Sequence, residues 1–317
     1  MSPFGFGLDW RKSPAHLLLL SKFLQPRVPD DFVQSEAWRA ALRETPHKSI
    51  KRYLHEGLLQ EAPLRERVDN KYRVSELRPM LEQRGLPAEG HKAELIQRLI
   101  DVDPKGMRTA VRGLRLLRCS EQGQNVAAQF LAQRHKSRAN LDSQVLSALQ
   151  QGRIREATQR IAAFEAQQAL PRTIDGPWKR YDTSTDFAIL KAIFQGKPGI
   201  LGSLSEDYIH CLRLAAAMMH LCGTEECRAW LPDGFQVPLR MDTEVAARML
   251  LFSAYHRCSV VSFLAAGIHT VGIRTRHNPC PACRAIAQQT YRISEVPELP
   301  YEGCSHERGC RCTMCEA

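Results

Sequence analysis

The sequence predicts a mainly α-helical protein of several domains, with a little β-structure close to a cysteine-rich C-terminus. Apolar residues recur at helical spacing along most of the chain. Proline and glycine interrupt this pattern at residues 170–182, where we expect a domain boundary. Six of the eleven cysteines lie in the last 38 residues. With 317 residues and 44% hydrophobic content, the chain is long enough for two or three domains with their own cores.

The positive charge of the chain is concentrated in its N-terminal half. The formal net charge is +10. Residues 1–170 hold 28 Lys and Arg against 19 Asp and Glu, whereas residues 171–317 hold 16 against 15. A localised basic excess indicates an acidic partner, most often nucleic acid or a membrane surface. The alternative is a basic surface that serves only solubility.

The first 71 residues predict helices in two segments. Residues 1–45 read as helical, with aromatic and proline interruptions. Residues 49–59, within a second segment at 46–71, predict an amphipathic helix that ends near Gly57. A helix followed by Gly–Leu–Leu is common in winged-helix domains, so the second segment is assigned a winged-helix-like character.

Residues 72–102 contain two short apolar runs joined by a glycine-rich loop. Ser75 is placed to cap the first helix and Gly85 to end it. The apolar residues of both runs fall on one helical face: Leu77, Met80 and Leu81 in the first, and Leu95, Ile96, Leu99 and Ile100 in the second. Two helices of about three turns each are therefore expected.

The rest of the chain divides into a basic helical region at 103–172 and a helical domain of unknown role at 173–275. The basic region carries Lys105, Arg108, Arg112, Arg115 and Arg118, and Ser120 is a candidate helix cap. One or two more polar helices are expected at 139–170. The second region predicts helices at 185–195, 205–222 and 243–257, and a strand from Ile268 to Thr275.

The segment at 72–102 resembles the SAP motif, a helix–extended loop–helix module of DNA-binding and chromatin-associated proteins. The matching residues are Val74, Glu76, Leu77, Arg78, Leu81, Arg84, Gly85, Leu86, Gly90, Lys92, Leu95, Ile96, Arg98 and Leu99. The resemblance implies binding to double-stranded DNA, often with a preference for AT-rich sequence.

The loop itself has the chemistry of a phosphate site. The start of a helix presents free backbone N–H groups to an anion. Gly90 has no side chain to obstruct a close approach, and His91 and Lys92 lie at the helix start, where a cation is unfavourable unless an anion is near. The alternative is a helical hairpin with solvated charges. The candidate DNA-binding residues are Arg73, Arg78, Arg84, Gly90, His91, Lys92 and Arg98.

The cysteine-rich tail at 276–317 predicts a small zinc module. The spacing Cys280-x-x-Cys283 places two thiolates on one side of a tight turn, and tetrahedral zinc needs two more ligands. The later candidates are Cys304, His306, Cys310, Cys312 and Cys315. We expect one structural Zn²⁺, because four protein ligands leave no open position. Reduced thiols and a redox CxxC are the alternatives.

The tail also resembles the C-terminal end of the phage Mu F-like head-morphogenesis family. The resemblance rests on the CxxC, the segment "YRISEVPELP" and the terminal "GCRC". Carried over by motif, it favours Cys280, Cys283, Cys304 and Cys312 as the zinc ligands, with Cys310 and Cys315 as alternates. It also makes a phage-derived head-morphogenesis or packaging component an alternative function.

No catalytic motif is present that would identify an enzyme. The phosphate-binding GxxxxGK(S/T), the dinucleotide-binding GxGxxG, HExxH and GxSxG are all absent. His277 and Asn278 precede Cys280, as in an HNH nuclease, but a second His-rich element is missing. Asp182, Asp186, Glu206 and Asp207 read as helix caps and surface carboxylates. A metal-dependent nuclease is a further alternative.

No segment approaches the length of a membrane span, and "AHLLLL" lacks the features of a signal peptide. A cytoplasmic, nucleoid-associated location is therefore expected, without membrane partners. Cys119, Cys211, Cys222, Cys227 and Cys258 are expected in the core. The sequence as a whole predicts a DNA-binding protein with a SAP module, a basic flank and a structural zinc tail, more consistent with a binding protein than with an enzyme.

Overall fold

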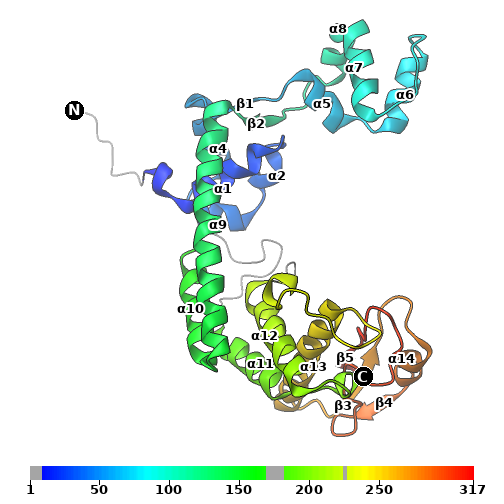
Figure 1. Ribbon diagram of the computed structural model, residues 1–317. Helices are drawn as coiled ribbons and strands as arrows, with labels where there is room; N and C mark the ends of the chain where they lie inside the picture. Colours follow the sequence, from blue (N-terminus) through cyan, green and yellow to red (C-terminus); the bar gives the residue numbers. More distant parts are fainter. Residues whose placement is uncertain (1–8, 169–181, 224–226) are drawn as a thin grey trace. The chain divides into compact units, whose positions relative to one another are not determined.

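The computed structural model describes residues 9–168, 182–223 and 227–317, and these are largely helical (Figure 1). Within them lie fourteen α-helices, α1 to α14, and five short strands. The prediction of a mainly α-helical, multi-domain protein is therefore confirmed. Of the described residues, 9–137 belong to one compact unit and 138–167 with 182–317 to a second. The boundary expected at 170–182 lies, except for residue 182, outside the described residues.

The first unit begins with a small helical subdomain that has its own apolar core. Trp10, Phe23, Trp38 and Tyr53 are buried in this core, and Tyr53 Oη donates to the His16 carbonyl oxygen over 2.8 Å. Its elements are η1 (Trp10–Lys12), α1 (Pro14–Ser21), η2 (Lys22–Leu24), α2 (Asp30–Val33), α3 (Glu36–Leu42), α4 (Pro46–His55), β1 (Leu59–Glu61) and β2 (Leu117–Cys119). The N-terminal half of α9 (Glu121–Gln150) also packs here, through Ala127.

Two paired strands bracket an insertion in this subdomain. β1 and β2 are antiparallel, with Leu59 opposite Cys119 and Glu61 opposite Leu117. The pairing continues one step further, because the Ala62 N–H donates to the Leu116 carbonyl over 2.9 Å. The segment between the two strands therefore begins and ends at the same place in the subdomain.

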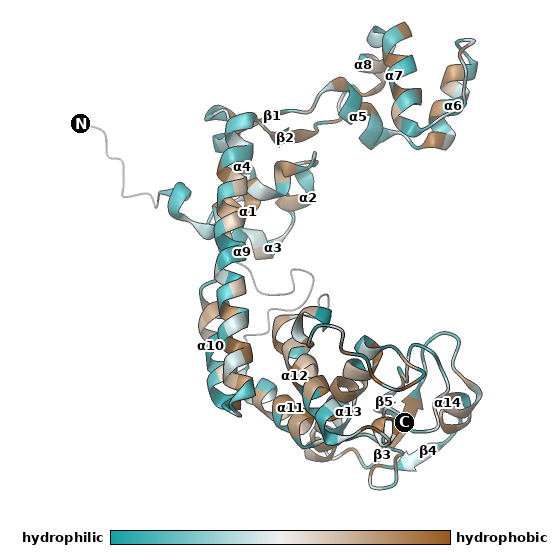
Figure 2. Cartoon of the chain, in the orientation of Figure 1, coloured by the Kyte–Doolittle hydropathy of each residue, from teal (hydrophilic) through white to brown (hydrophobic). Residues whose placement is uncertain are grey.

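The insertion folds into a four-helix module, composed of α5 (Leu64–Lys71), α6 (Val74–Glu82), α7 (Lys92–Val102) and α8 (Pro104–Ala110). Hydrophobic and hydrophilic residues are interspersed along these short helices (Figure 2), as one-sided burial requires. The buried residues form one core: Val68, Leu77, Leu81, Leu95, Ile96, Leu99, Met107 and Val111. The two helices expected from sequence are therefore confirmed, and α5 and α8 complete their core.

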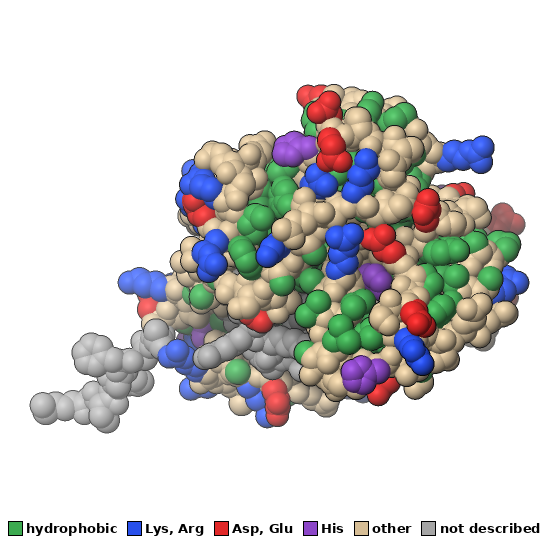
Figure 3. Space-filling view, turned by 90° about the horizontal axis from the view of Figure 1, so that it is seen from below, with side chains coloured by type: hydrophobic (Ala, Val, Ile, Leu, Met, Phe, Trp, Pro, Cys, Tyr) green, Lys and Arg blue, Asp and Glu red, His purple; other side chains and the backbone are tan. Residues whose placement is uncertain are grey.

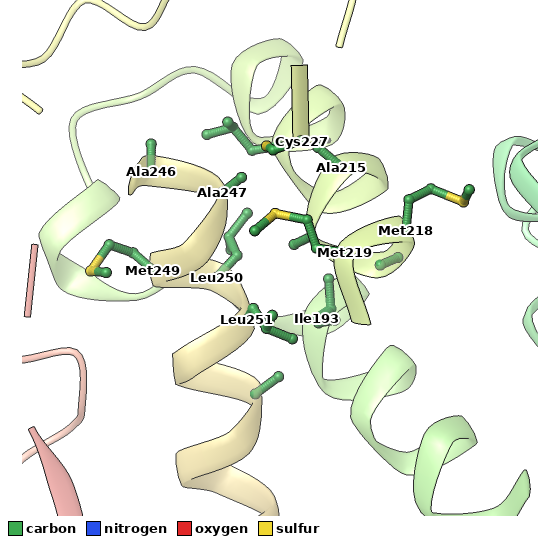
Figure 4. Close-up of a cluster of buried hydrophobic side chains, with 14 of the residues drawn as sticks. Ile193, Ala215, Met218, Met219, Cys227, Ala246, Ala247, Met249, Leu250 and Leu251 are labelled. Carbon is green, nitrogen blue, oxygen red and sulfur yellow. The ribbon is translucent and has the colours of Figure 1, made fainter. Parts of the chain in front are cut away.

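The second unit is built around three helices. Its helical elements are the C-terminal part of α9, α10 (Ile154–Ala166), α11 (Thr183–Gln195), η3 (Gly199–Leu201), α12 (Glu206–Cys222), η4 (Cys227–Trp230), α13 (Thr243–Ala265) and α14 (Pro281–Ile286). Ile193 of α11, Met219 of α12 and Leu250 of α13 are buried together in the core (Figure 4). Met219 and Leu250 point toward one another across the α12–α13 contact.

A three-stranded antiparallel sheet joins the cysteine-rich tail to the rest of this unit. β3 (Thr270–Arg274) lies in the centre, between β4 (Thr290–Arg292) and β5 (Thr313–Glu316). Val271 pairs with Tyr291 on one side, and Gly272 pairs with Cys315 on the other. The strand expected before the cysteines is confirmed, and it supplies the edge on which both tail strands form.

Some local expectations were wrong. The first helix of the SAP-like segment begins at Val74 with Arg73 as its N-cap, so Ser75 lies inside the helix. The helix expected to end at residue 257 continues to Ala265, and its buried residues lie in the half nearer the N-terminus, between Ala246 and Ala254. Of the five cysteines expected in the core, Cys119 and Cys227 are buried there and Cys222 and Cys258 pack against it while partly exposed, whereas Cys211 is partly exposed. None of the helices among the described residues combines the length and apolar character that a membrane span needs.

Candidate nucleic-acid interface and metal centre

Gly85 ends α6 and sets the direction of the loop that follows. Its φ of +64° is a left-handed conformation that favours glycine. The Gly85 N–H donates to the Glu82 carbonyl and the Leu86 N–H to the Leu81 carbonyl, both over 3.0 Å. These two bonds form a Schellman motif, which satisfies the last carbonyls of the helix. The expectation that Gly85 ends the first helix is confirmed.

Both helices of the SAP-like segment have an N-cap residue whose backbone N–H is bound by a glutamate of the first turn. The Arg73 N–H donates to Glu76 Oε2 over 2.7 Å, and the His91 N–H donates to Glu94 Oε2 over 3.0 Å. Each glutamate lies in the first turn of its helix, where its charge complements the helix dipole. The side chains of Arg73 and His91 are exposed.

Arg84 and Asp103 connect three helices of the module. Arg84 Nη2 lies 2.7 Å from Asp103 Oδ2, and Arg84 Nη1 donates to the Met80 carbonyl over 2.9 Å. Asp103 also caps α8, because its Oδ1 accepts the Gly106 N–H over 2.8 Å. The Arg84 hydrogen bond, and next the Gly106 N–H, lower the pKa of Asp103 below its ordinary value. Arg84 therefore has a clear role within the protein.

Two other candidate cations also have partners inside the module. Lys92 Nζ lies 2.9 Å from Asp69 Oδ1, which links the start of α7 to α5. Arg98 Nη1 donates to the carbonyl oxygens of Pro87, over 2.9 Å, and Glu89, over 2.5 Å. Arg98 therefore holds the loop between α6 and α7 in place.

The conformation of the loop explains why residue 90 is a glycine. Its φ is +117°, a conformation that L side chains rarely adopt. A Cβ at this position would lie 2.3 Å from Glu94 Oε2 and 3.4 Å from Arg98 Nη2. Glycine thus allows Glu94 to close over the loop and reach the His91 N–H.

The structure therefore divides the seven predicted DNA-binding residues. Arg84, Lys92 and Arg98 bind groups of the module itself, and Gly90 shapes its loop. The remaining three, Arg73, Arg78 and His91, have exposed side chains.

The basic excess of the chain lies next to the SAP-like segment rather than within it. Residues 70–103 carry six Lys and Arg against six Asp and Glu. Residues 104–138 carry eight against one. Four of these cations, which we call the basic segment, are exposed on α8 and the turn after it: Lys105, Arg108, Arg112 and Arg115. Arg118 differs, because it is paired with Glu66.

The basic segment is attached firmly to the module. Met107 and Val111, which alternate with its cations, are buried in the module core. The carbonyls at the end of α8 accept hydrogen bonds from side chains of α5: Arg67 Nη2 donates to the Val111 oxygen over 3.1 Å, and Lys71 Nζ donates to the Ala110 oxygen. The exposed cations are therefore presented by a packed element.

Five tail cysteines converge in the second unit. Cys280, Cys283 and Cys304 form one group in which all three Sγ atoms lie within 4.8 Å of one another, and Cys283, Cys310 and Cys312 form another. The Cys280–Cys304 Sγ separation is 3.8 Å and the Cys283–Cys310 separation is 3.9 Å. Two ligands of a tetrahedral zinc with bonds of about 2.3 Å are separated by about 3.8 Å. The arrangement can hold a metal ion.

A small cavity lies among these thiols. Its volume is about 20 Å³, and its lining includes Cys280, Cys283, Cys304 and Cys312. That volume matches about one water-sized sphere. The buried Cys310 is near Cys283 but is not part of the lining.

Two of the thiols are surrounded by hydrogen-bond donors that favour the thiolate. At Cys280, burial opposes ionisation, but the backbone N–H groups of Cys283 and Ser305 outweigh it and lower the pKa to about 7. At Cys310, the hydrogen bond from the Cys312 thiol lowers the pKa to about 5 despite burial. Metal binding requires thiolates, so both positions suit ligands.

Two other tail candidates lie in different surroundings. Cys315 lies on β5, where its Sγ is 3.6 Å from the position that a Cβ of Gly272 would take. His306 lines the small cavity, but its Nδ1 accepts the Arg308 N–H over 3.0 Å and its Nε2 lies 3.1 Å from Arg311 Nη2. Both neighbours are donors and an imidazole has one acceptor nitrogen, so His306 accepts one of these hydrogen bonds within the tail.

Sequence reasoning missed a hydrogen-bonded chain of three side chains in the second unit. His220 Nε2 lies 2.9 Å from Asp186 Oδ1, and His220 Nδ1 lies 3.0 Å from Tyr255 Oη. The sequence suggested a cap or surface role for Asp186, but its side chain is only 14% exposed. Asp182 does cap α11, by accepting the Ser184 N–H over 2.9 Å. No sequence spacing predicts that these three side chains meet, because α11, α12 and α13 each supply one of them.

Comparison with known proteins identifies one part of this chain. The family described as "SAP domain" matches residues 70–103, which comprise α6, α7 and the loop between them. A SAP domain is a nucleic-acid-binding module, and we use this name below for residues 70–103. No curated protein matches the chain, and no solved structure does. The resemblance of the tail to the Mu F-like family gains no support from these comparisons.

Proposed function

We propose that this protein binds duplex DNA through its SAP domain and the basic segment. The family match at residues 70–103 is the observation that carries the proposal. The charge distribution supports it, because the SAP domain is formally neutral and the exposed cations follow it directly, on α8 and the residues after it. Cations supply most of the sequence-independent affinity for DNA. The SAP domain would then position the protein on the duplex, and the basic segment would strengthen binding.

The geometry assigns different roles to the candidate residues. Arg73, Arg78 and His91 are exposed and can reach phosphates. Arg84, Lys92 and Arg98 act as positioning residues, because each ties together parts of the module. Gly90 belongs with them, since it gives Glu94 the space to close the loop.

A salt-titrated binding assay on the full-length protein tests the role of the basic segment. The variant replaces Lys105, Arg108, Arg112 and Arg115 with Gln. If each cation neutralises one phosphate, the slope of log K against log[salt] should fall by about 3 to 4 units. Affinity for a labelled duplex should fall at every salt concentration. Duplexes of AT-rich and GC-rich sequence of equal length, used in parallel, test the preference that the SAP resemblance implies.

A matched control separates local contacts from net charge. The control variant replaces four exposed arginines of the second unit, Arg240, Arg274, Arg284 and Arg292, with Gln. On the face shown in Figure 3, Lys and Arg are interspersed with Asp and Glu, so no concentrated positive field is expected there. The control should bind DNA nearly as the unaltered protein does. Equal losses in the two variants would contradict the proposed interface.

We further propose that the five-cysteine cluster holds one structural zinc ion. Soft thiolate ligands select zinc over magnesium or calcium, and the Cys280–Cys304 sulfur separation fits a tetrahedral site. The cavity lining favours Cys280, Cys283, Cys304 and Cys312 as ligands. Four protein ligands leave no position for substrate, so the ion would stabilise the tail rather than act in catalysis.

A further inference from the structure

A second cavity lies beside the cysteine cluster, in the second unit. Its volume is about 380 Å³, a size suited to a small organic ligand. Most of its wall is apolar, including Phe252, Leu299 and Met314. It shares Cys312, Arg276 and Arg311 with the lining of the ion-sized cavity. We call it the side cavity.

The polar groups of the side cavity are all neutral or positive. They are Tyr255, His256, Ser259, Arg276, Arg311, Cys312 and Thr313, and no Asp or Glu contributes to the lining. Two guanidinium groups at one cavity favour a ligand that carries a negative charge. The carboxylate of Glu298 acts electrostatically on the pKa of His256, but Glu298 is itself paired with Arg257.

His256 contributes to the wall of the side cavity. Its Nδ1 has no hydrogen-bond partner among the described residues, but it also has almost no accessible surface, so a ligand in the cavity would meet other atoms of the ring. Burial lowers the pKa of His256, so the ring adds no positive charge to the cavity at pH 7.

Tyr255 is a fixed part of the cavity wall. A carboxylate only accepts hydrogen bonds, so His220 donates through Nε2 to Asp186. Its Nδ1 lies within hydrogen-bond distance of the Tyr255 hydroxyl, at 3.0 Å. The Asp186–His220–Tyr255 chain thus holds the aromatic ring in one orientation at the rim of the cavity.

We propose that the side cavity binds a small organic anion with an apolar body. The body lies against Phe252, Leu299 and Met314, and the negative group meets Arg276 and Arg311. None of the residues that line this cavity belongs to the proposed DNA-binding surface. The proposal therefore does not depend on DNA binding.

The two arginines have a competing role that the test must separate. Both also line the ion-sized cavity, where they can balance the charge of thiolates bound to a metal. A guanidinium carries five N–H donors in one plane, so it can serve two groups on different edges. If the arginines served only the thiolates, the side cavity would prefer neutral ligands.

Two fluorescent probes of similar shape make this distinction in the full-length protein. 1-Anilinonaphthalene-8-sulfonate carries a sulfonate, and N-phenyl-1-naphthylamine has the same ring system without it. We expect one sulfonate probe per chain, bound more tightly than the neutral probe. Arg276→Gln should weaken the sulfonate probe about tenfold, the size expected for a charge-assisted bond. It should leave the neutral probe within about twofold.

Two further variants locate the binding and control for charge. Ser259→Trp fills the cavity and should abolish binding of both probes, with an unchanged melting temperature and metal content showing that the fold is intact. Arg274→Gln removes an exposed arginine of β3 outside the cavity and should change neither affinity. Binding that survives Ser259→Trp, or probes that bind equally well and respond equally to Arg276→Gln, would overturn the proposal.

Discussion

The SAP domain with its flanking helices and the cysteine-rich tail are both small, but they are held together differently. The four-helix module buries eight apolar residues, and all of them come from residues 68–111. The tail contributes its cysteines and a few apolar residues to the core of the second unit, and its two strands pair with β3. One region is therefore stabilised by its own sequence, whereas the other depends on what it docks against and on its thiols.

The difference follows from how much apolar surface each region can bury. A segment with one apolar residue in every three or four can form amphipathic helices and close a core locally. The stretch from residue 301 to 317 is dominated by glycine, charged residues and cysteine, and it cannot bury enough apolar surface alone. A metal supplies folding free energy in such regions.

The largest effect should come from Cys283→Ser. Cys283 belongs to both groups of clustered sulfurs, so its loss leaves no complete set of three. Metal content measured by plasma mass spectrometry on untagged protein should fall from about one zinc per chain to near zero. Hydrogen exchange should accelerate from residue 277 onward, while the SAP domain stays protected and DNA affinity persists.

Controls at two other cysteines sharpen this test. Cys258→Ser changes a partly exposed cysteine outside the cluster and should leave metal content unchanged. Cys310→Ser should retain the metal if Cys312 is the fourth ligand, as the cavity lining favours. Full metal content in Cys283→Ser would contradict the zinc proposal. Loss of metal in Cys310→Ser would show that Cys310, rather than Cys312, is the fourth ligand.

A core truncation in the four-helix module should have the next largest effect. Leu99 is fully buried in the module core, so Leu99→Ala should lower the free energy of unfolding by about 2–5 kcal/mol. Val102→Ala, at an exposed position of the same helix, should change it by less than about 0.5 kcal/mol. Hydrogen exchange of the α6 and α7 amides measures both. Loosening of the tail by Leu99→Ala would contradict the separation of the two regions.

The local character of the module explains why much of it could be predicted. Leu77, Leu81 and Leu95 lie within eighteen residues of one another on short helices, so periodicity alone identified their buried face. Gly85 ended its helix as expected, since a left-handed residue leaves a clear signal. The N-cap was misplaced because Ser75 is a good cap by residue type, whereas the actual signal was Glu76 reaching back to Arg73.

The tail shows where such prediction ends. The CxxC spacing identified Cys280 and Cys283, but the choice among the later cysteines depends on how β5 pairs with β3. That pairing keeps Cys315 on the sheet and brings Cys304, Cys310 and Cys312 to the CxxC turn. The side chains of Asp186, His220 and Tyr255 meet only through helix packing, so no local pattern could identify them.

A pair of arginine variants tests the division between contact and positioning residues in the SAP domain. Arg78 is exposed, so Arg78→Gln should reduce the salt slope of DNA binding by about 1 and leave stability unchanged. Arg84 is bound to Asp103 and Met80, so Arg84→Gln should destabilise the module with little change in slope. For both variants, salt-titrated anisotropy measures the slope of DNA binding and hydrogen exchange measures the stability of the module. The reverse pattern would make Arg84 the DNA contact.

The smallest effect concerns the charge on Asp103 alone. Asp103→Asn keeps an N-cap for α8, because Asn caps as well as Asp, but it removes the ion pair with Arg84. The pKa of Asp103 is lowered in the folded protein, chiefly by Arg84, so the ion pair adds stability above the ordinary pKa of about 3.9. That stability is lost as pH falls through the lowered value. At pH 7 the α6 and α7 amides of the variant should therefore exchange slightly faster than those of the unaltered protein, after correction for intrinsic rates. As the pH falls from the ordinary pKa through the lowered one, the two proteins should converge, because protonation then removes the same charge from the unaltered protein. A difference that stays constant with pH would mean that Asp103 acts through hydrogen-bond geometry rather than through its charge.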